Sequence, residues 1–213
     1  MAKYYFYKLT HDNGGAPCVQ NGLLSLAICK PKIRSTAEVD DIILGFAANS
    51  LHFDNRLLYV ARVTKKLVAG DYFRSVAYRH RADCIYFGRS GRYHVRPNAQ
   101  YHGSIADLYH DLGKHAVYER ANTLLSNKFC YFGVSGSAAY KRNFPAVARA
   151  IARLKQGHRV YHDPKLLHEL AQLANSSCSL TRAQLLGNPS QPPTRGVSLR
   201  GGSCGIACVK GAC

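Results

Sequence analysis

The sequence contains few acidic residues and no tryptophan. Asp and Glu together number 12 against 29 Lys and Arg, so the formal net charge is +17 at neutral pH. A charge of this size attracts polyanions over about one Debye length. The composition therefore points to DNA or RNA as the partner, although the same excess would also serve solubility alone. Charge does not indicate which bases are read.

The signatures of several large enzyme classes are also missing. The chain has no GxxxxGK[ST], no GxGxxG that opens a helix, no GxSxG and no HExxH. NTPase, dinucleotide-dependent, serine-hydrolase and zincin activities therefore have no local support. The histidines do not show paired ligand spacing, because a turn is expected between His158 and His162. We expect neither a metal nor a cofactor.

Long hydrophobic runs are absent as well. No stretch approaches the ~20 apolar residues that cross a bilayer, and the first residues, MAKYYFYKLTHD, lack the apolar centre of a signal peptide. A cytoplasmic protein without a membrane partner is therefore expected. Four of the cysteines are widely spread in the sequence, and we expect them to be reduced thiols, mostly small and buried. They are Cys18, Cys29, Cys84 and Cys130.

What the sequence does contain is a series of short apolar runs separated by Gly, Asn, Asp and Pro. These runs predict strands at residues 4–9, 23–28, 42–46, 57–63, 84–87, 92–96 and 129–134. Start signals such as Ser104, Pro145 and Asp163 predict helices. The helices are expected at 71–78, 105–112, 146–154 and 165–173. The chain is therefore expected to be α+β, with a small curved sheet or β-barrel, short helices and C-terminal helices.

The composition changes near residue 176. From there onward the chain has no acidic residue and is rich in Pro, Gly and Ser, which predicts a disordered basic tail. We therefore expect one domain at residues 1–175 and a tail at 176–213. Cys204, Cys208 and Cys213 in this tail are one ligand short of a four-ligand zinc site, and no histidine lies nearby.

A cluster of cations lies in the segment CKPKIR, between two predicted strands. The cations are Lys30, Lys32 and Arg34. Pro31 lies among them and interrupts strand pairing. Arg binds a phosphate through two parallel hydrogen bonds, whereas Lys acts as a point charge. The segment is therefore a candidate phosphate-binding loop, and the alternative is that its cations pair with the acids at 40–41.

The segment from 81 to 103, RADCIYFGRSGRYHVRPNAQYHG, interleaves aromatic and polar residues with arginines. Tyrosine rings are stacking platforms for unpaired bases, and each stacked base contributes about 1–3 kcal/mol. Arginines between them bind the flanking phosphates. The pattern predicts a surface for single-stranded nucleic acid or an extruded base. The alternative is that the tyrosines belong to the core and the arginines form a solvated rim.

Several segments, taken in order, resemble the second nucleotide modification associated domain family, which is similar in style to PUA, ASCH and EVE barrels. The resemblance covers about residues 4–162. It rests on HDNGGAPCVQNGLLSLAICKPKIRSTAEVDDIILGF, RLLYVARVTK with GDYF, DCIYFGRSGRYHVRPNAQYHG, LLSNKFCYFGVSG and, more weakly, QGHRV. The matching positions are Asp12, Gly15, Ala16, Pro17, Cys29, Lys30, Pro31, Arg34, Asp41, Asp83, Tyr86, Asn98, His102, Ser126, Phe129, Phe132 and Gly133. One departure is Asp40, where the family usually has glycine.

The resemblance implies association with modified nucleobases in DNA or RNA, by recognising them or by helping to make them within a base-modification system. Its PUA/EVE-like fold would form a basic, Tyr-lined pocket. Tyr86 or Tyr93 would stack on the base, and Asn98 or Asp83 would read its edge. The base must be unpaired or flipped, because a pocket does not reach into a stacked duplex. The candidate base- and nucleic-acid-binding residues are Asp12, Lys30, Lys32, Arg34, Asp83, Tyr86, Arg92, Tyr93, Arg96, Asn98 and His102.

Two other functions stay open from the sequence alone. One is an enzyme that acts on a base or nucleotide, with Cys29 or His102 in nucleophilic or acid–base work. Asp83 or Asp12 would be its acidic partner, although the sequence does not bring a nucleophile and a base side by side. The other is a basic accessory protein of a nucleic-acid complex, whose domain has no pocket.

Overall fold

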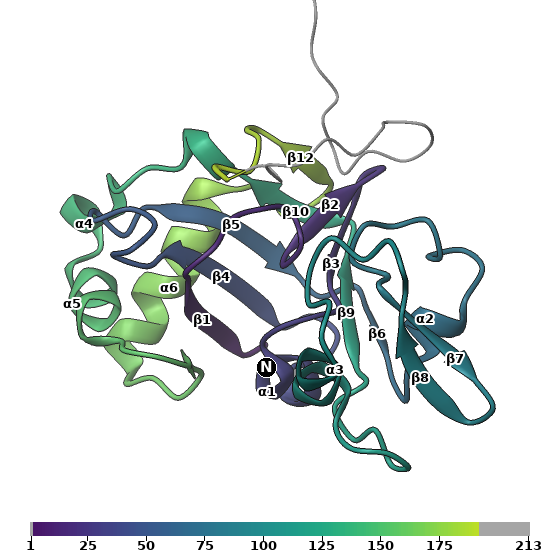
Figure 1. The fold of residues 1–213 in the computed structure, drawn as a ribbon. Helices are drawn as coiled ribbons and strands as arrows, with labels where there is room; N and C mark the ends of the chain where they lie inside the picture. Colours follow the sequence, from purple (N-terminus) through teal and green to yellow (C-terminus); the bar gives the residue numbers. More distant parts are fainter. Residues whose placement is uncertain (1, 192–213) are drawn as a thin grey trace, which may run out of the picture.

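The computed structural model describes residues 2–191, which form two larger sheets, a β-hairpin and several helices (Figure 1). The larger sheet has six strands in the order β11-β1-β4-β5-β10-β12. In chain order they are β1 (Tyr4–Leu9), β4 (Ile42–Ala47), β5 (Leu57–Arg62), β10 (Lys128–Tyr131), β11 (His158–Arg159) and β12 (Ala183–Leu185). β1 and β4 are parallel, whereas the central pair β4 and β5 is antiparallel.

The second sheet has four strands in the order β2-β3-β9-β6. These are β2 (Cys18–Gln20), β3 (Leu23–Leu26), β6 (Lys65–Leu67) and β9 (Thr123–Ser126). The hairpin of β7 (Tyr86–Arg89) and β8 (Arg92–Val95) forms a separate two-stranded sheet. It projects beside the second sheet, at the end of the molecule away from α5 and α6 (Figure 1).

Three of the helices, α3, α5 and α6, begin at start signals noted in the sequence. The helices are α1 (Pro31–Thr36), α2 (Asp71–Arg74), α3 (Ile105–Leu112), α4 (Tyr140–Asn143), α5 (Pro145–Arg153) and α6 (Pro164–Ser177), with a 3-10 turn η1 (Gly133–Ser135). The Ser104 hydroxyl accepts a hydrogen bond from the backbone N–H of Asp107 at 3.1 Å. In the same way, Oδ1 of Asp163 caps α6 by accepting a hydrogen bond from the backbone N–H of Leu166 at 2.9 Å. Within residues 2–191, no helix combines the length and apolar character needed to cross a membrane.

Side chains of β1 alternate between two apolar cores, because successive residues of a strand point to opposite faces. Tyr5 and Tyr7 face a core that includes residues of β3 and β9, between the two larger sheets. Phe6 faces a second core that includes residues of α5 and α6, which lie along the six-stranded sheet (Figure 1). A third core joins the hairpin, α3 and the second sheet. Leu9 of the first core and Ile28 of the third line one cavity, so the site described below lies where these cores meet.

The predicted α+β class with a small curved sheet is confirmed. None of the sheets closes into a barrel within the described part of the chain. Each predicted strand and helix overlaps an observed one. The strands β2, β6, β9, β11 and β12 and the helices α1 and α4 are not predicted. These strands contain only two to four residues, too few for an alternating pattern to stand out.

The expectation that Cys130 is a reduced thiol is wrong. Cys130 of β10 and Cys178, which follows α6, form a disulfide with their Cα atoms 5.8 Å apart. They are 48 residues apart in sequence and meet because both lie in the second core, against α6. Spacing in the sequence carries no signal for such a bond. Cys29 and Cys84 are free thiols, as expected.

Regular structure continues past the expected domain end at residue 175. α6 extends to Ser177, and β12 pairs in parallel with β10 through residues such as Leu185. The expected tail is therefore corrected for 176–191, where strand pairing and the disulfide anchor the chain. The remainder of that tail, with its three cysteines, lies outside the described residues.

Candidate active site

Cys29 lies in a turn between β3 and α1. Cys29 and Lys30 have φ angles of 55° and 44°, in the left-handed region that residues other than glycine rarely occupy. Two hydrogen bonds hold the backbone of Cys29. Its N–H donates to Oδ1 of Asp111 at 2.7 Å, and its carbonyl oxygen accepts from Nε of Arg34 at 2.7 Å. Pro31 then starts α1, because its ring presets a helical φ angle.

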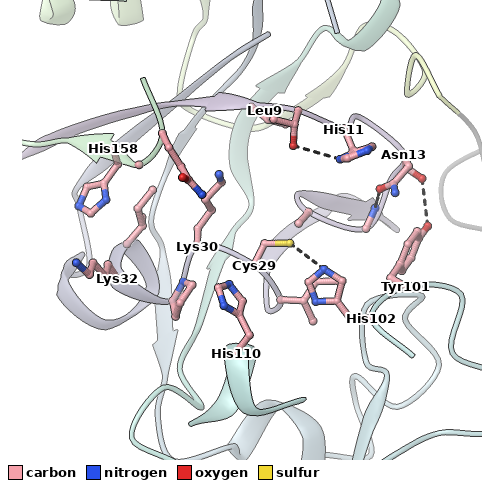
Figure 2. Close-up of a pocket in the computed structure, with 18 of the residues that line it drawn as sticks. Leu9, His11, Asn13, Cys29, Lys30, Lys32, Tyr101, His102, His110 and His158 are labelled. Atoms are coloured by element: carbon pink, nitrogen blue, oxygen red, sulfur yellow. Dashed lines mark hydrogen bonds between the residues drawn. The ribbon is translucent and has the colours of Figure 1, made fainter. Parts of the chain in front are cut away.

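A triad of Cys29, His102 and Asp111 is linked by hydrogen bonds. Sγ of Cys29 lies 3.2 Å from Nε2 of His102. Figure 2 marks this contact with a dashed line. Nδ1 of the same ring lies 2.6 Å from Oδ2 of Asp111. His102 comes from the loop before α3, and Asp111 comes from α3 itself. Thiol-dependent enzymes use the same series of hydrogen-bonded groups: a nucleophile, a base next to it, and a third group that orients the base.

His102 is charged at neutral pH. Its hydrogen bonds to Asp111 and then to Cys29 raise the pKa of His102 to about 10. The ring therefore carries a proton on each nitrogen, so that Nδ1–H donates to the carboxylate and Nε2–H donates to the sulfur. A charge-assisted hydrogen bond favours the anionic form of its acceptor. For a thiol, the anion is the nucleophilic form.

Asp111 is fully buried, and several donors satisfy its carboxylate. Oδ2 also accepts a hydrogen bond from the hydroxyl of Tyr86 at 2.8 Å, and Oδ1 lies 3.8 Å from the guanidinium of Arg34. Burial, followed by the charge of Asp111, raises the pKa of Tyr86, so its phenol stays protonated and donates. The sequence interpretation misses Asp111. The one sequence feature that points to Asp111 is its position on the apolar face of α3, beside Leu108 and Leu112, where an acid is unusual.

Arg34 holds the backbone of two triad residues. Its guanidinium donates to the carbonyl oxygens of Cys29, Arg120, Asn122 and Asp111 at distances from 2.5 to 2.8 Å. Burial lowers the pKa of Arg34 to about 10, so the side chain keeps its charge at neutral pH. The expectation that Arg34 contacts phosphate is therefore corrected, because its guanidinium is buried and bonded to protein carbonyls.

A cavity of about 640 Å³ opens beside Cys29 (Figure 2). Its lining includes Cys29, Lys30, Lys32, His102, His110 and His158. Four predicted site residues, Cys29, Lys30, Lys32 and His102, therefore meet here. No Asp or Glu is found among the described residues that line it. The volume lies within the range of about 300–1,000 Å³ found for small-molecule sites, and the lining favours an anionic ligand.

The tyrosine that lines this cavity is Tyr101, whereas the expected stacking residues were Tyr86 and Tyr93. Tyr86 is fully buried, and Tyr93 donates its hydroxyl to the carbonyl oxygen of Gly70 at 3.2 Å. Both rings pack in the third core, so their expected role as stacking platforms is corrected to a structural one. The hydroxyl of Tyr101 donates to the carbonyl oxygen of Asn13 at 3.2 Å.

The two acids expected beside the nucleophile lie elsewhere. Asp83 is buried and accepts hydrogen bonds from Ser25 at 2.5 Å and from Tyr72 at 2.6 Å. Burial raises the pKa of Asp83. Asp12 accepts a hydrogen bond from Tyr131. Both acids stabilise the fold, and within residues 2–191 no three potential metal ligands gather into a metal site.

The remaining predicted residues lie in the β7–β8 hairpin and the loop that follows it. Arg92 and Asn98 are exposed, and the guanidinium carbon of Arg96 lies 5.8 Å from the ring centroid of Phe87. These residues do not line the cavity. The structure therefore brings the CKPKIR lysines to the thiol and leaves the predicted arginines on a separate surface.

The lysines of CKPKIR are not neutralised by the acids that follow them. The carboxylate of Asp41 accepts from the backbone N–H groups of Lys3 and Glu38. Among the described residues, neither Lys30 nor Lys32 forms a salt bridge. The alternative of an internally paired loop is therefore corrected, and the two positive charges stay available at the cavity.

The model of a family described as nucleotide modification associated domain 2 matches residues 1–193. No curated protein and no solved structure matches the chain. The family match spans all the described residues and so includes the triad and the cavity.

Proposed function

The chain belongs to the nucleotide modification associated domain 2 family, and we propose that it is an enzyme that helps to make a modified nucleotide through the thiol of Cys29. The observation that carries the proposal is the triad of Cys29, His102 and Asp111 at a cavity of nucleotide size. The family supplies the association with nucleotide modification. The nucleophilic role of Cys29 is the step that we add.

Each triad residue has a separate task in this proposal. The sulfur of Cys29 attacks an electrophilic carbon of the base and forms a C–S bond. The electrons of the attacked double bond move onto the base, which takes the proton from Nε2 of His102. Asp111 keeps the ring oriented and charged through its hydrogen bond to Nδ1. The carbon next to the attacked one then bonds to an electrophilic group of a co-substrate, whose leaving group departs. Loss of the hydrogen of that carbon as a proton, with return of the base's proton to His102, lets the Cys29 sulfur leave and restores the double bond in the modified base.

The nucleotide is either free or part of DNA or RNA. In a strand it must be unpaired or flipped, because the thiol lies at a cavity. The exposed Arg89 and Arg92 of the hairpin, with Arg96 and Asn98 near it, then contact the flanking strand. A cytoplasmic location and partners in a base-modification system belong to the same proposal.

The test compares nucleosides from cells that express the wild-type chain with nucleosides from cells that express Cys29→Ser. DNA, RNA and the free nucleotide pool are digested and analysed by mass spectrometry. We expect a nucleoside mass that depends on the wild-type chain and disappears with Cys29→Ser. Cys84→Ala is the matched control, because Cys84 is a free but buried thiol.

Two results would contradict an enzyme. In the first, Cys29→Ser leaves every nucleoside unchanged. In the second, the purified chain binds one modified base selectively and never converts it. The second result identifies a reader of modified bases, which is the other function that the family allows. A loss of product with Cys84→Ala as well would indicate a general defect in folding, which thermal unfolding of both variants detects.

A further inference from the structure

The two lysines of the cavity and His158 lie on the side away from His102 (Figure 2). Figure 2 shows Lys32 and His158 together at one side, with Lys30 between them and Cys29. His102 and Tyr101 lie on the opposite side of the thiol. The cavity therefore has a cationic end and a catalytic end.

Within residues 2–191, neither lysine at the cationic end forms a salt bridge. The amine of Lys30 is 3.5 Å from the carbonyl oxygen of Lys8 and 4.9 Å from the ring centroid of Tyr7. Burial lowers the pKa of Lys30. Burial, then the charges of Lys32 and Lys30, lowers the pKa of His158, so the three groups lie close enough to repel one another. An anion placed among them relieves this repulsion.

We propose that Lys30, Lys32 and His158 bind the phosphate of a nucleotide and thereby direct its base toward Cys29. This inference rests on the proposed function, to which it adds the orientation of the substrate. The cavity of about 640 Å³ has room for one nucleotide. The phosphate of a free monophosphate carries about −1.5 to −2 charges near neutral pH and that of a strand carries one, so the two lysines suit either, and the half-buried imidazole of His158 supplies a further hydrogen-bond donor.

The experiment measures binding of the four common deoxynucleoside 5′-monophosphates, the corresponding nucleosides and a short single-stranded oligonucleotide by calorimetry. The key variant is Lys32→Gln, because Lys32 is exposed and its loss leaves the core intact. Lys165→Gln is the matched control, since Lys165 is an exposed lysine of α6 that does not line the cavity. Lys30→Gln is a second variant, and thermal unfolding verifies that each one folds.

We expect the wild-type chain to bind a monophosphate at least about tenfold more tightly than its nucleoside. Lys32→Gln and Lys30→Gln should lose most of this preference, whereas Lys165→Gln should keep it. A loss seen only with free monophosphates identifies a free nucleotide as the source of the phosphate. A loss seen only with the oligonucleotide identifies a strand. The proposal is overturned if Lys32→Gln and Lys165→Gln behave alike with both ligands.

Failure of the phosphate site and failure of the thiol mechanism give different results. Alkylation of Cys29 by iodoacetamide is measured on the same samples without ligand. In one outcome, Cys29 reacts no faster than the buried Cys18 and Cys84, while the preference for monophosphates still depends on Lys32. This outcome contradicts the enzyme proposal and supports the phosphate site. A reactive Cys29 in a chain without that preference contradicts the phosphate site alone.

Discussion

Asp111 accepts a hydrogen bond of 2.6 Å from Nδ1 of His102, and it does so from the apolar face of α3. A buried acid in this position keeps the ring of His102 turned toward the sulfur of Cys29, 3.2 Å away. The pair explains why the CKPKIR segment carries a cysteine. Of the free cysteines in the described part of the chain, Cys29 is the one that is not buried.

Replacing His102 by Gln should slow alkylation of Cys29 by iodoacetamide at least about tenfold, because the neutral amide replaces the charge-assisted hydrogen bond of the imidazolium to the sulfur with a weaker one. The rate is measured by mass spectrometry of the Cys29 peptide. His110→Gln is the control, since His110 lines the same cavity but is not part of the triad. Equal rates in the wild type and His102→Gln would show that the ring does not activate the sulfur.

The stability that His102 contributes should depend on pH. Its pKa is about 10 in the folded chain, above the value of 6.5 for an ordinary histidine. The contribution is therefore fully present below about pH 6.5 and is lost as the pH rises toward 10. We expect the difference in melting temperature between the wild type and His102→Gln to shrink over this interval. A difference that grows with pH would contradict a charged ring.

Replacing Arg34 by Lys should lower the free energy of unfolding by about 2–4 kcal/mol, because one ammonium does not satisfy the buried carbonyls that the guanidinium binds. Urea unfolding measures the change. Arg153→Lys, at the exposed end of α5, should leave stability nearly unchanged. If Arg34 instead serves as a phosphate ligand, the variant should keep its stability and lose only nucleotide binding.

Replacing Asp83 by Asn should destabilise the chain by about 3 kcal/mol, because Arg81 is left without its carboxylate partner in the interior. The alkylation rate of Cys29 should stay the same, since Asp83 lies outside the triad. Urea unfolding measures the stability. The alkylation rate is measured on the same preparation without urea. A selective loss of thiol reactivity would return Asp83 to the list of catalytic groups.

Reduction of the disulfide between Cys130 and Cys178 should lower the free energy of unfolding by about 2–4 kcal/mol, because the bond closes a loop with a sequence separation of 48 residues. Unfolding by urea with and without dithiothreitol measures the effect. The double variant Cys130→Ala, Cys178→Ala should be insensitive to the reductant. A wild-type curve that does not move on reduction would contradict the prediction.

The secondary structure was largely predictable, because its signals are local. β1 has the predicted bounds, since its aromatic run is interrupted on both sides. α3 also has the predicted bounds, and Ser104 caps it as expected. The helix α1 was hidden, because Pro31 and three neighbouring cations are equally typical of a loop.

The candidate site was predictable only in part. The sequence points to Cys29 and His102 by their own chemistry, but it offers Asp83 or Asp12 as the acidic partner and misses Asp111. It also suggests Tyr86 as a stacking residue, although Tyr101 lines the cavity. The choice between core and pocket for two similar tyrosines depends on which other elements pack against them.

The sequence by itself determined the charge, the family and most helix and strand positions, because these depend on composition and on short patterns. Only the tertiary structure decided the triad, the burial of Arg34 and the disulfide. Cys29 and His102 are 73 residues apart in sequence, and their 3.2 Å contact depends on the packing of α3 against the turn before α1. Contacts of this kind follow from the joint burial of several elements, so no local pattern specifies them.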